Sequence, residues 1–259
     1  MNEAQRPRAL TLGAVGLVGG LFAGVFGVGG GLVMIPLLLW WTHMDQRRAN
    51  ATSLMAITPA AIVGAISYGV GGVFEWLPAL FVAAGSITGA QLGARILARI
   101  PLVPLKWGFI VFIIVSAVFL FLEVPSREGS LEITLTTAIV LVGLGVLMGI
   151  ASGLFGIGGG IIVIPAIMLF LGGSDIVAKS ISLLAMAPGS LSGTLGHLRY
   201  KTADLRDGAW VAVGAVITTP VGSALAFLLS PRWGAILFGA LTVVVAVSLI
   251  IRAVGERKS

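Results

Sequence analysis

The chain has 259 residues, of which 58% are hydrophobic and only 10% are charged, and its mean hydropathy is +1.09. A soluble domain carries about 25% charged residues, so the composition excludes an ordinary soluble fold and predicts an all-α polytopic membrane protein. The net charge of +6 does not indicate nucleic-acid binding, because Lys and Arg gather in short loops and at the chain ends, as they do in membrane proteins. With no cysteine and two histidines, neither a metal site nor a cofactor is expected.

The apolar segments form two groups, separated by the polar loop 123–132. The first group is a broken segment at 9–41 followed by 48–71, 77–98 and 103–122, and the second is a broken segment at 133–171 followed by 177–197, 208–229 and 233–251. Several of these runs exceed the roughly 20 apolar residues that a membrane-spanning helix needs. We expect the first run to be retained rather than removed as a signal peptide, because more spans follow and no small-residue cleavage site does.

Glycine clusters interrupt the first segment of each group. Residues 24–36 read GVFGVGGGLVMIP, and residues 153–165 read GLFGIGGGIIVIP, 129 positions later. The same offset aligns further pairs without a gap: Ser53 with Ser182, Pro59 with Pro188, Gly64 with Gly193, Gly85 with Gly214 and Gly93 with Gly222. The sequence therefore predicts a duplication, with residues 1–122 as the first repeat and 133–259 as the second.

The positions of the basic residues predict how the repeats cross the membrane. Basic residues lie before the first segment, at 43–48, between 95 and 106, between 199 and 206, and at the C-terminus. All of them share one side of the membrane only if each broken segment enters the membrane and turns back. The length of the arm after the glycines agrees, because about 11 residues at 1.5 Å per residue are too short to span. Each repeat is then a re-entrant hairpin plus three spans, and the repeats are inverted, a construction typical of secondary transporters. This places both termini in the cytoplasm of a bacterium or archaeon, with the chain in the inner membrane.

The hairpin tips are the candidate anion site. A helix that restarts after glycines presents free N–H groups and the positive end of its dipole, which suit an anion, and glycine lets a ligand approach the backbone. The predicted site residues are Phe26, Gly27, Gly29, Gly30 and Gly31, with their counterparts Phe155, Gly156, Gly158, Gly159 and Gly160. The alternative is that the glycines only permit close helix packing, which we expect of Gly13, Gly16, Gly19 and Gly20.

Two FG(V/I)GGG-x4-P motifs in register, each followed by a small Ser/Thr-bearing stretch (ANATSL and AKSISL), carry a family resemblance. The chain resembles the TauE/SafE family of sulfite exporters over nearly its whole length. The resemblance implies a transporter of sulfur-containing anions such as sulfite, sulfoacetate or related sulfonates. An anion channel of the same fold and a carrier for a non-sulfur anion remain alternatives. An enzyme is not expected, because neither APGSLSG nor AAGSITG contains the Gly-x-Ser-Gly nucleophile of an intramembrane serine protease.

Polar residues at the start of two spans could donate hydrogen bonds to an oxyanion: Asn50, Thr52 and Ser53 in one, and Lys179, Ser180 and Ser182 in the other. Alternatively, Asn and Ser could cap the helices, and Lys179 could extend to the interface. Pro59 and Pro188 are expected to break or kink these helices.

Gln91 and His197 are candidates for a helix contact, a cavity or ion coupling. An amide within a span needs a partner, so Gln91 joins two helices or faces a cavity. His197 could carry a coupling proton or simply end a helix at the interface. No carboxylate lies clearly inside a span, although proton-coupled carriers usually bury one, so both proton and sodium coupling stay open. The partners expected are a small anion and the lipid bilayer, and a homodimer is compatible with the sequence.

Overall fold

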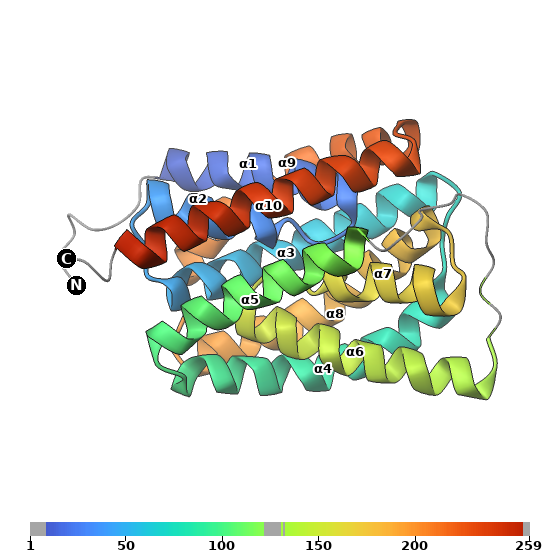
Figure 1. Cartoon of the computed structure of the whole chain (residues 1–259), viewed down its shortest axis with the longest axis horizontal. Helices are drawn as coiled ribbons and strands as arrows, with labels where there is room; N and C mark the ends of the chain where they lie inside the picture. Colours follow the sequence, from blue (N-terminus) through green and yellow to red (C-terminus); the bar gives the residue numbers. More distant parts are fainter. Residues whose placement is uncertain (1–8, 122–130, 132, 256–259) are drawn as a thin grey trace.

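The computed structural model describes residues 9–121, 131 and 133–255, so the linker expected at 123–132 lies almost wholly outside it. Within these residues every regular element is an α-helix (Figure 1). The helices are α1 (Ala9–Phe26), α2 (Gly31–Trp41), α3 (Gln46–Val70), α4 (Trp76–Arg99), α5 (Leu102–Phe121), α6 (Leu135–Phe155), α7 (Gly160–Leu171), α8 (Asp175–Arg199), α9 (Leu205–Leu228) and α10 (Pro231–Gly255). The all-helical prediction is confirmed, and the helices match the expected apolar segments to within a few residues.

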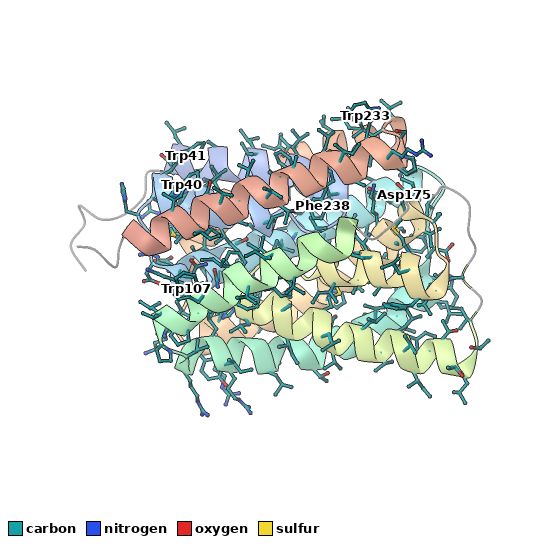
Figure 2. All side chains as sticks on the ribbon, in the orientation of Figure 1. Trp40, Trp41, Trp107, Asp175, Trp233 and Phe238 are labelled. Carbon is teal, nitrogen blue, oxygen red and sulfur yellow. The ribbon has the colours of Figure 1, made fainter. Side chains whose placement is uncertain are left out.

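Seven of the described helices are long and apolar enough to cross a membrane: α1, α3, α4, α6, α8, α9 and α10. They lie side by side, so that the connections gather at two ends (Figure 1). The loops 42–45 and 200–204 and the turn between α4 and α5 share one end, which we call the basic end. The turns 71–75, 172–174 and 229–230 share the other, which we call the opposite end. Trp40, Trp41 and Trp107 lie near the basic end and Trp233 near the opposite end (Figure 2), as expected for residues that prefer the membrane interface.

Each broken segment folds back on itself. A Cβ added at Gly30 would overlap the carbonyl oxygen of Gly19, and one added at Gly19 would overlap the side chain of Met34. In a continuous helix these residues would lie far apart, at 1.5 Å per residue. The second segment repeats the reversal, since a Cβ on Gly159 would lie 2.5 Å from the Met148 carbonyl oxygen. The α1–α2 hairpin opens toward the basic end and the α6–α7 hairpin toward the opposite end (Figure 1).

The two halves of the chain interlock through rows of glycines. On α1, a Cβ at Gly16, Gly20 or Gly24 would overlap the backbone of α9, and on α6 their counterparts Gly145, Gly149 and Gly153 meet the backbone of α4 in the same way. Small residues let membrane helices approach this closely. The first arm of each hairpin is therefore packed against a helix of the other half. Among the described residues nothing lies within 4 Å of a Cβ on Gly13, so the packing does not require a glycine there, although a Cβ on Gly214 of α9 would overlap the Gly13 carbonyl oxygen.

Helices α3 and α8 differ from two expectations, one about their N-caps and one about their internal prolines. Asp45 and Ser174, again 129 residues apart, are the N-caps: their side chains accept hydrogen bonds from the N–H groups of Arg48 at 2.9 Å and Val177 at 3.4 Å. Asn50 lies inside α3 and is not a cap, because the helix begins four residues earlier than its position. Both helices continue through their internal prolines, Pro59 and Pro188, so these prolines do not divide the spans.

Candidate functional site

The hairpin tips owe their shape to glycines in the left-handed region. Gly27, Gly29 and Gly30 have φ values of 68°, 88° and 73°, and their counterparts Gly156, Gly158 and Gly159 have 69°, 87° and 78°. Residues with a Cβ rarely adopt these values. The turn ends one helix and starts the next within four residues, and the new helices α2 and α7 have only a glycine at the N-cap, with no side-chain cap.

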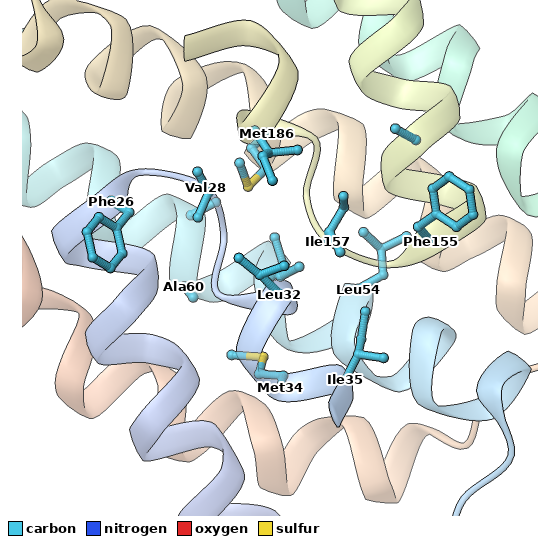
Figure 3. Close-up of a cluster of buried hydrophobic side chains, with 14 of the residues drawn as sticks. Phe26, Val28, Leu32, Met34, Ile35, Leu54, Ala60, Phe155, Ile157 and Met186 are labelled. Carbon is cyan, nitrogen blue, oxygen red and sulfur yellow. The ribbon is translucent and has the colours of Figure 1, made fainter. Parts of the chain in front are cut away.

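The two tips touch each other (Figure 3). A Cβ on Gly31 would overlap the Gly156 carbonyl oxygen, and one on Gly160 would lie 2.8 Å from the Gly27 carbonyl oxygen. The two contacts are equivalent, because Gly31 corresponds to Gly160 and Gly27 to Gly156 at the 129-residue offset. The structure thus brings the two glycine tips into contact, while Phe26 and Phe155 lie on opposite sides of them, and all ten predicted tip residues are buried.

Apolar side chains fill the contact between the tips. Val28 and Ile157, one from each tip, are 4% and 2% exposed. Met186 of α8 approaches both tips, since its sulfur would lie 2.5 Å and 2.6 Å from a Cβ on Gly29 and on Gly158 (Figure 3). In this conformation the anion expected between the two glycine clusters would have to displace these side chains.

Three of the six polar candidates, Asn50, Ser53 and Ser182, form hydrogen bonds at the tips. Ser53 Oγ donates to the Gly156 carbonyl and Ser182 Oγ to the Gly27 carbonyl, both at 2.9 Å. Asn50 Nδ2 donates to the Leu154 carbonyl at 3.1 Å, and its Oδ1 accepts from Gln46 at 2.8 Å. Each serine hydroxyl therefore joins a span of one half of the chain to the tip of the other half.

The remaining members of this polar set differ. Ser180 Oγ donates to the Val73 carbonyl at 2.9 Å, at the opposite end of the molecule. Thr52 is fully buried, and its Oγ1 has no hydrogen-bond partner within the described residues.

Lys179 borders a cavity beside the tips. Its ammonium lies 3.3 Å from Asp175, one helical turn earlier on α8, and the side chains of the pair are 11% and 5% exposed. The cavity has a volume of about 40 Å³, and its walls include Phe26, Val28, Gly160, Ile161 and Phe238. On the same measure a single water needs roughly 10–15 Å³, so the space suits a molecule of a few heavy atoms. The cavity lies toward the opposite end of the molecule, where Asp175 is labelled in Figure 2.

Gln91 and His197 lie away from this cavity. Gln91 Nε2 donates to the Ser192 carbonyl at 2.6 Å and contacts its hydroxyl at 3.0 Å, so it joins α4 to α8. His197 is fully buried, with Nδ1 3.1 Å from Thr202 Oγ1. Its Nε2 has no hydrogen-bond partner among the described residues, although the Gly153 carbonyl lies near the ring. Its counterpart Tyr68 donates to Gly24, the counterpart of Gly153, at 3.0 Å.

Sequence reasoning missed three residues of this region: Met186, Phe238 and Asp175. The spacing of Asp175 and Lys179, four apart on one helix, is typical of an ion pair and could have identified the aspartate. Nothing in the sequence singles out Met186 or Phe238 among many apolar residues. Within the described part of the chain, no three His, Cys, Asp or Glu side chains gather where they could bind a metal ion.

Comparison with known proteins identifies the family. The family described as "Sulfite exporter TauE/SafE" matches residues 1–120 and 141–259. The chain belongs to this family. It is therefore a member of a family of membrane transporters, and its apolar helices are those of an integral membrane protein.

Several relatives share most of their length with this TauE/SafE member. A protein of Xylella fastidiosa (strain 9a5c) named "Probable membrane transporter protein" is 29% identical, covering 94% of this chain and 95% of its own. In Bacillus subtilis (strain 168), the probable membrane transporter proteins YjnA and YdhB are 27% and 26% identical, covering 84% and 79% of this chain and 90% and 84% of their own. No solved structure matches the chain.

Proposed function

We propose that this TauE/SafE member is a secondary transporter that moves a small sulfur-containing anion, such as sulfite, sulfoacetate or a related sulfonate, across the inner membrane by alternating access. The observation that carries the proposal is the meeting of two glycine tips from hairpins that open toward opposite ends. A ligand held where the tips meet lies at the boundary between the halves of the chain, where a small relative movement exposes it to one side or the other.

The charges support the orientation in the proposal. The basic loops share one end of the molecule (Figure 1), which is the cytoplasmic end by the positive-inside rule. At that end Arg48 of α3 forms an ion pair with Asp207 of α9, which joins the two halves. Both termini then lie in the cytoplasm.

The test is transport by the purified protein in proteoliposomes. Sulfite, sulfate, thiosulfate, sulfoacetate, taurine and simple carboxylates are offered in turn, with protein-free vesicles as the control. We expect saturable uptake of at least one sulfur-containing anion and counterflow when the same anion is present inside. Large single-channel currents would identify a channel, and uptake of carboxylates alone would identify a carrier for non-sulfur anions; either result contradicts the proposal.

A bulky substitution of Gly30 is not a suitable test of the site. Because a side chain there would overlap the Gly19 carbonyl within the same hairpin, the variant is expected to misfold, and loss of transport would say nothing about the ligand.

A further inference from the structure

The two sides of the tip contact are not equivalent, although the sequence is duplicated. The cavity beside Lys179 is bordered by Gly234 of α10, where an added Cβ would have no atom of the described residues within 4 Å. The position related to Gly234 in the first repeat is Leu105 of α5, which is 1% exposed. Next to it, Phe109 is fully buried, and its ring lies tilted against that of Phe155 with centroids 5.5 Å apart, which is the counterpart of the Phe238–Phe26 contact on the other side; the difference between the two sides is therefore the leucine at 105 against the glycine at 234. The side facing the opposite end is therefore hollow at a place where the side facing the basic end is filled.

The charge is one-sided as well. Lys179 borders the cavity, whereas its counterpart Asn50 is neutral, fully buried and hydrogen-bonded to Gln46 and Leu154. Lys179 and Asp175 are the charged residues among the described residues that line the cavity, and their formal charges cancel. An anion that takes the place of Asp175 beside the ammonium keeps Lys179 paired, and the displaced Asp175 carboxylate then has to take up a proton or turn to another donor, because a buried charge left unpaired is unfavourable.

The walls indicate the kind of anion. Apart from this pair and the backbone of Gly160 at the start of α7, the lining is apolar and includes Phe26 and Phe238, whose rings are 4.9 Å apart. A dianion would lose much of its hydration against these walls and gain a single cation in return, which is unfavourable. A monoanion with a short apolar part would place its charge at Lys179 and its apolar part against the rings.

We propose that this cavity is the loading site of the transporter, entered from the opposite end, and that Lys179 there exchanges Asp175 for a small monovalent anion with an apolar part. The proposal rests on the transport function proposed above and adds to it the side of entry and the residue that recognises the charge.

The experiment uses the absence of cysteine from the chain. Gly234→Cys places one thiol in the cavity, and Leu105→Cys places one at the related position of the first repeat. Intact cells or sealed vesicles of known orientation are treated from the outer side with an anionic reagent, sulfonatoethyl methanethiosulfonate, or with its cationic trimethylammonioethyl analogue. In both cases the thiolate forms a mixed disulfide and releases methanesulfinate. Ala235→Cys, also on the cavity wall, serves if Gly234→Cys is poorly folded, and size-exclusion chromatography checks the fold of every variant.

We expect Gly234→Cys to react several-fold faster with the anionic reagent than with the cationic one, because the Lys179 ammonium can pair with the sulfonate, while the nearby Asp175 carboxylate reduces the net field. Adding Lys179→Gln should reverse this preference, because the Asp175 carboxylate then remains as the charge on the cavity wall, and adding Asp175→Asn should increase it. Leu105→Cys should stay unlabelled from the outer side. Equal rates with both reagents, or labelling of Leu105→Cys as fast as that of Gly234→Cys, would overturn the proposal. Reaction with only the membrane-permeant N-ethylmaleimide would also overturn it, because the cavity would then be closed to charged molecules from the outer side.

The labelling does not depend on transport, so the two proposals fail separately. Anion transport without the predicted labelling pattern would support the proposed function and refute the loading site. The labelling pattern without transport of any sulfur-containing anion would support the anion cavity and refute the proposed function.

Discussion

Replacing the two tip-binding serines with alanine tests whether the repeats support each other's hairpins. Ser53 and Ser182 are fully buried, and each donates one 2.9 Å hydrogen bond to a glycine carbonyl in the tip of the other repeat. Removing either hydroxyl leaves a buried carbonyl without that donor, which costs about 1–3 kcal/mol of unfolding free energy. At roughly 2–4 °C per kcal/mol for a chain of this size, each single variant should lose several degrees in Tm.

The matched control is Ser152→Ala. Ser152 is 2% exposed, and its Oγ has no hydrogen-bond partner within the described residues, so its removal leaves no partner group unpaired and should not lower the unfolding free energy. The assay is thermal unfolding of the purified protein in detergent, followed by tryptophan fluorescence. If Ser152→Ala lowers Tm as much as Ser182→Ala does, or if both tip variants melt like the unmodified protein, the hydrogen bonds do not stabilise the tips.

Two further predictions concern a helix contact and a titrating group. Gly149→Ala should lower the unfolding free energy by about 1–3 kcal/mol, because the new Cβ overlaps the Ser86 carbonyl of α4. The control is Gly143→Ala on the same helix, whose Cβ meets no described residue within 4 Å and which should be neutral or stabilising by up to about 1 kcal/mol. Equal melting temperatures of the two variants would refute the glycine contact. At the basic end, Arg95 Nε donates to the Tyr200 hydroxyl at 3.3 Å and thereby lowers the pKa of that phenol. Arg95→Gln should therefore raise the pKa of Tyr200, measured by ultraviolet titration of the phenol. An unchanged pKa would show that this contact is absent in solution.

Much of the fold could be predicted because membrane segments carry strong local signals. Long apolar runs fix the helices, since every backbone group in a bilayer must be paired within its own segment. Glycines and the 129-residue offset mark where the chain breaks and that it does so twice, and the structure shows the expected reversals at Gly27–Gly30 and Gly156–Gly159. The family follows from the same motifs and is confirmed.

The candidate site was predictable only in part, because a side chain's role depends on what lies across from it. Ser53 and Asn50 have the donors that an oxyanion needs, but their partners are carbonyls of the other repeat, more than a hundred residues away in sequence. The anion-binding role of the tip residues stays a prediction, as do the bilayer orientation, the coupling ion and a homodimer.

The sequence by itself determined that this chain is an all-helical membrane protein with a glycine break in each half, because those features depend on residues close together in the chain. Only the tertiary structure decided that the halves interlock and that one side of the tips is hollow. A glycine at 234 and a leucine at 105 are visible in the sequence, but what each leaves open or fills depends on helices that meet only when the chain is folded.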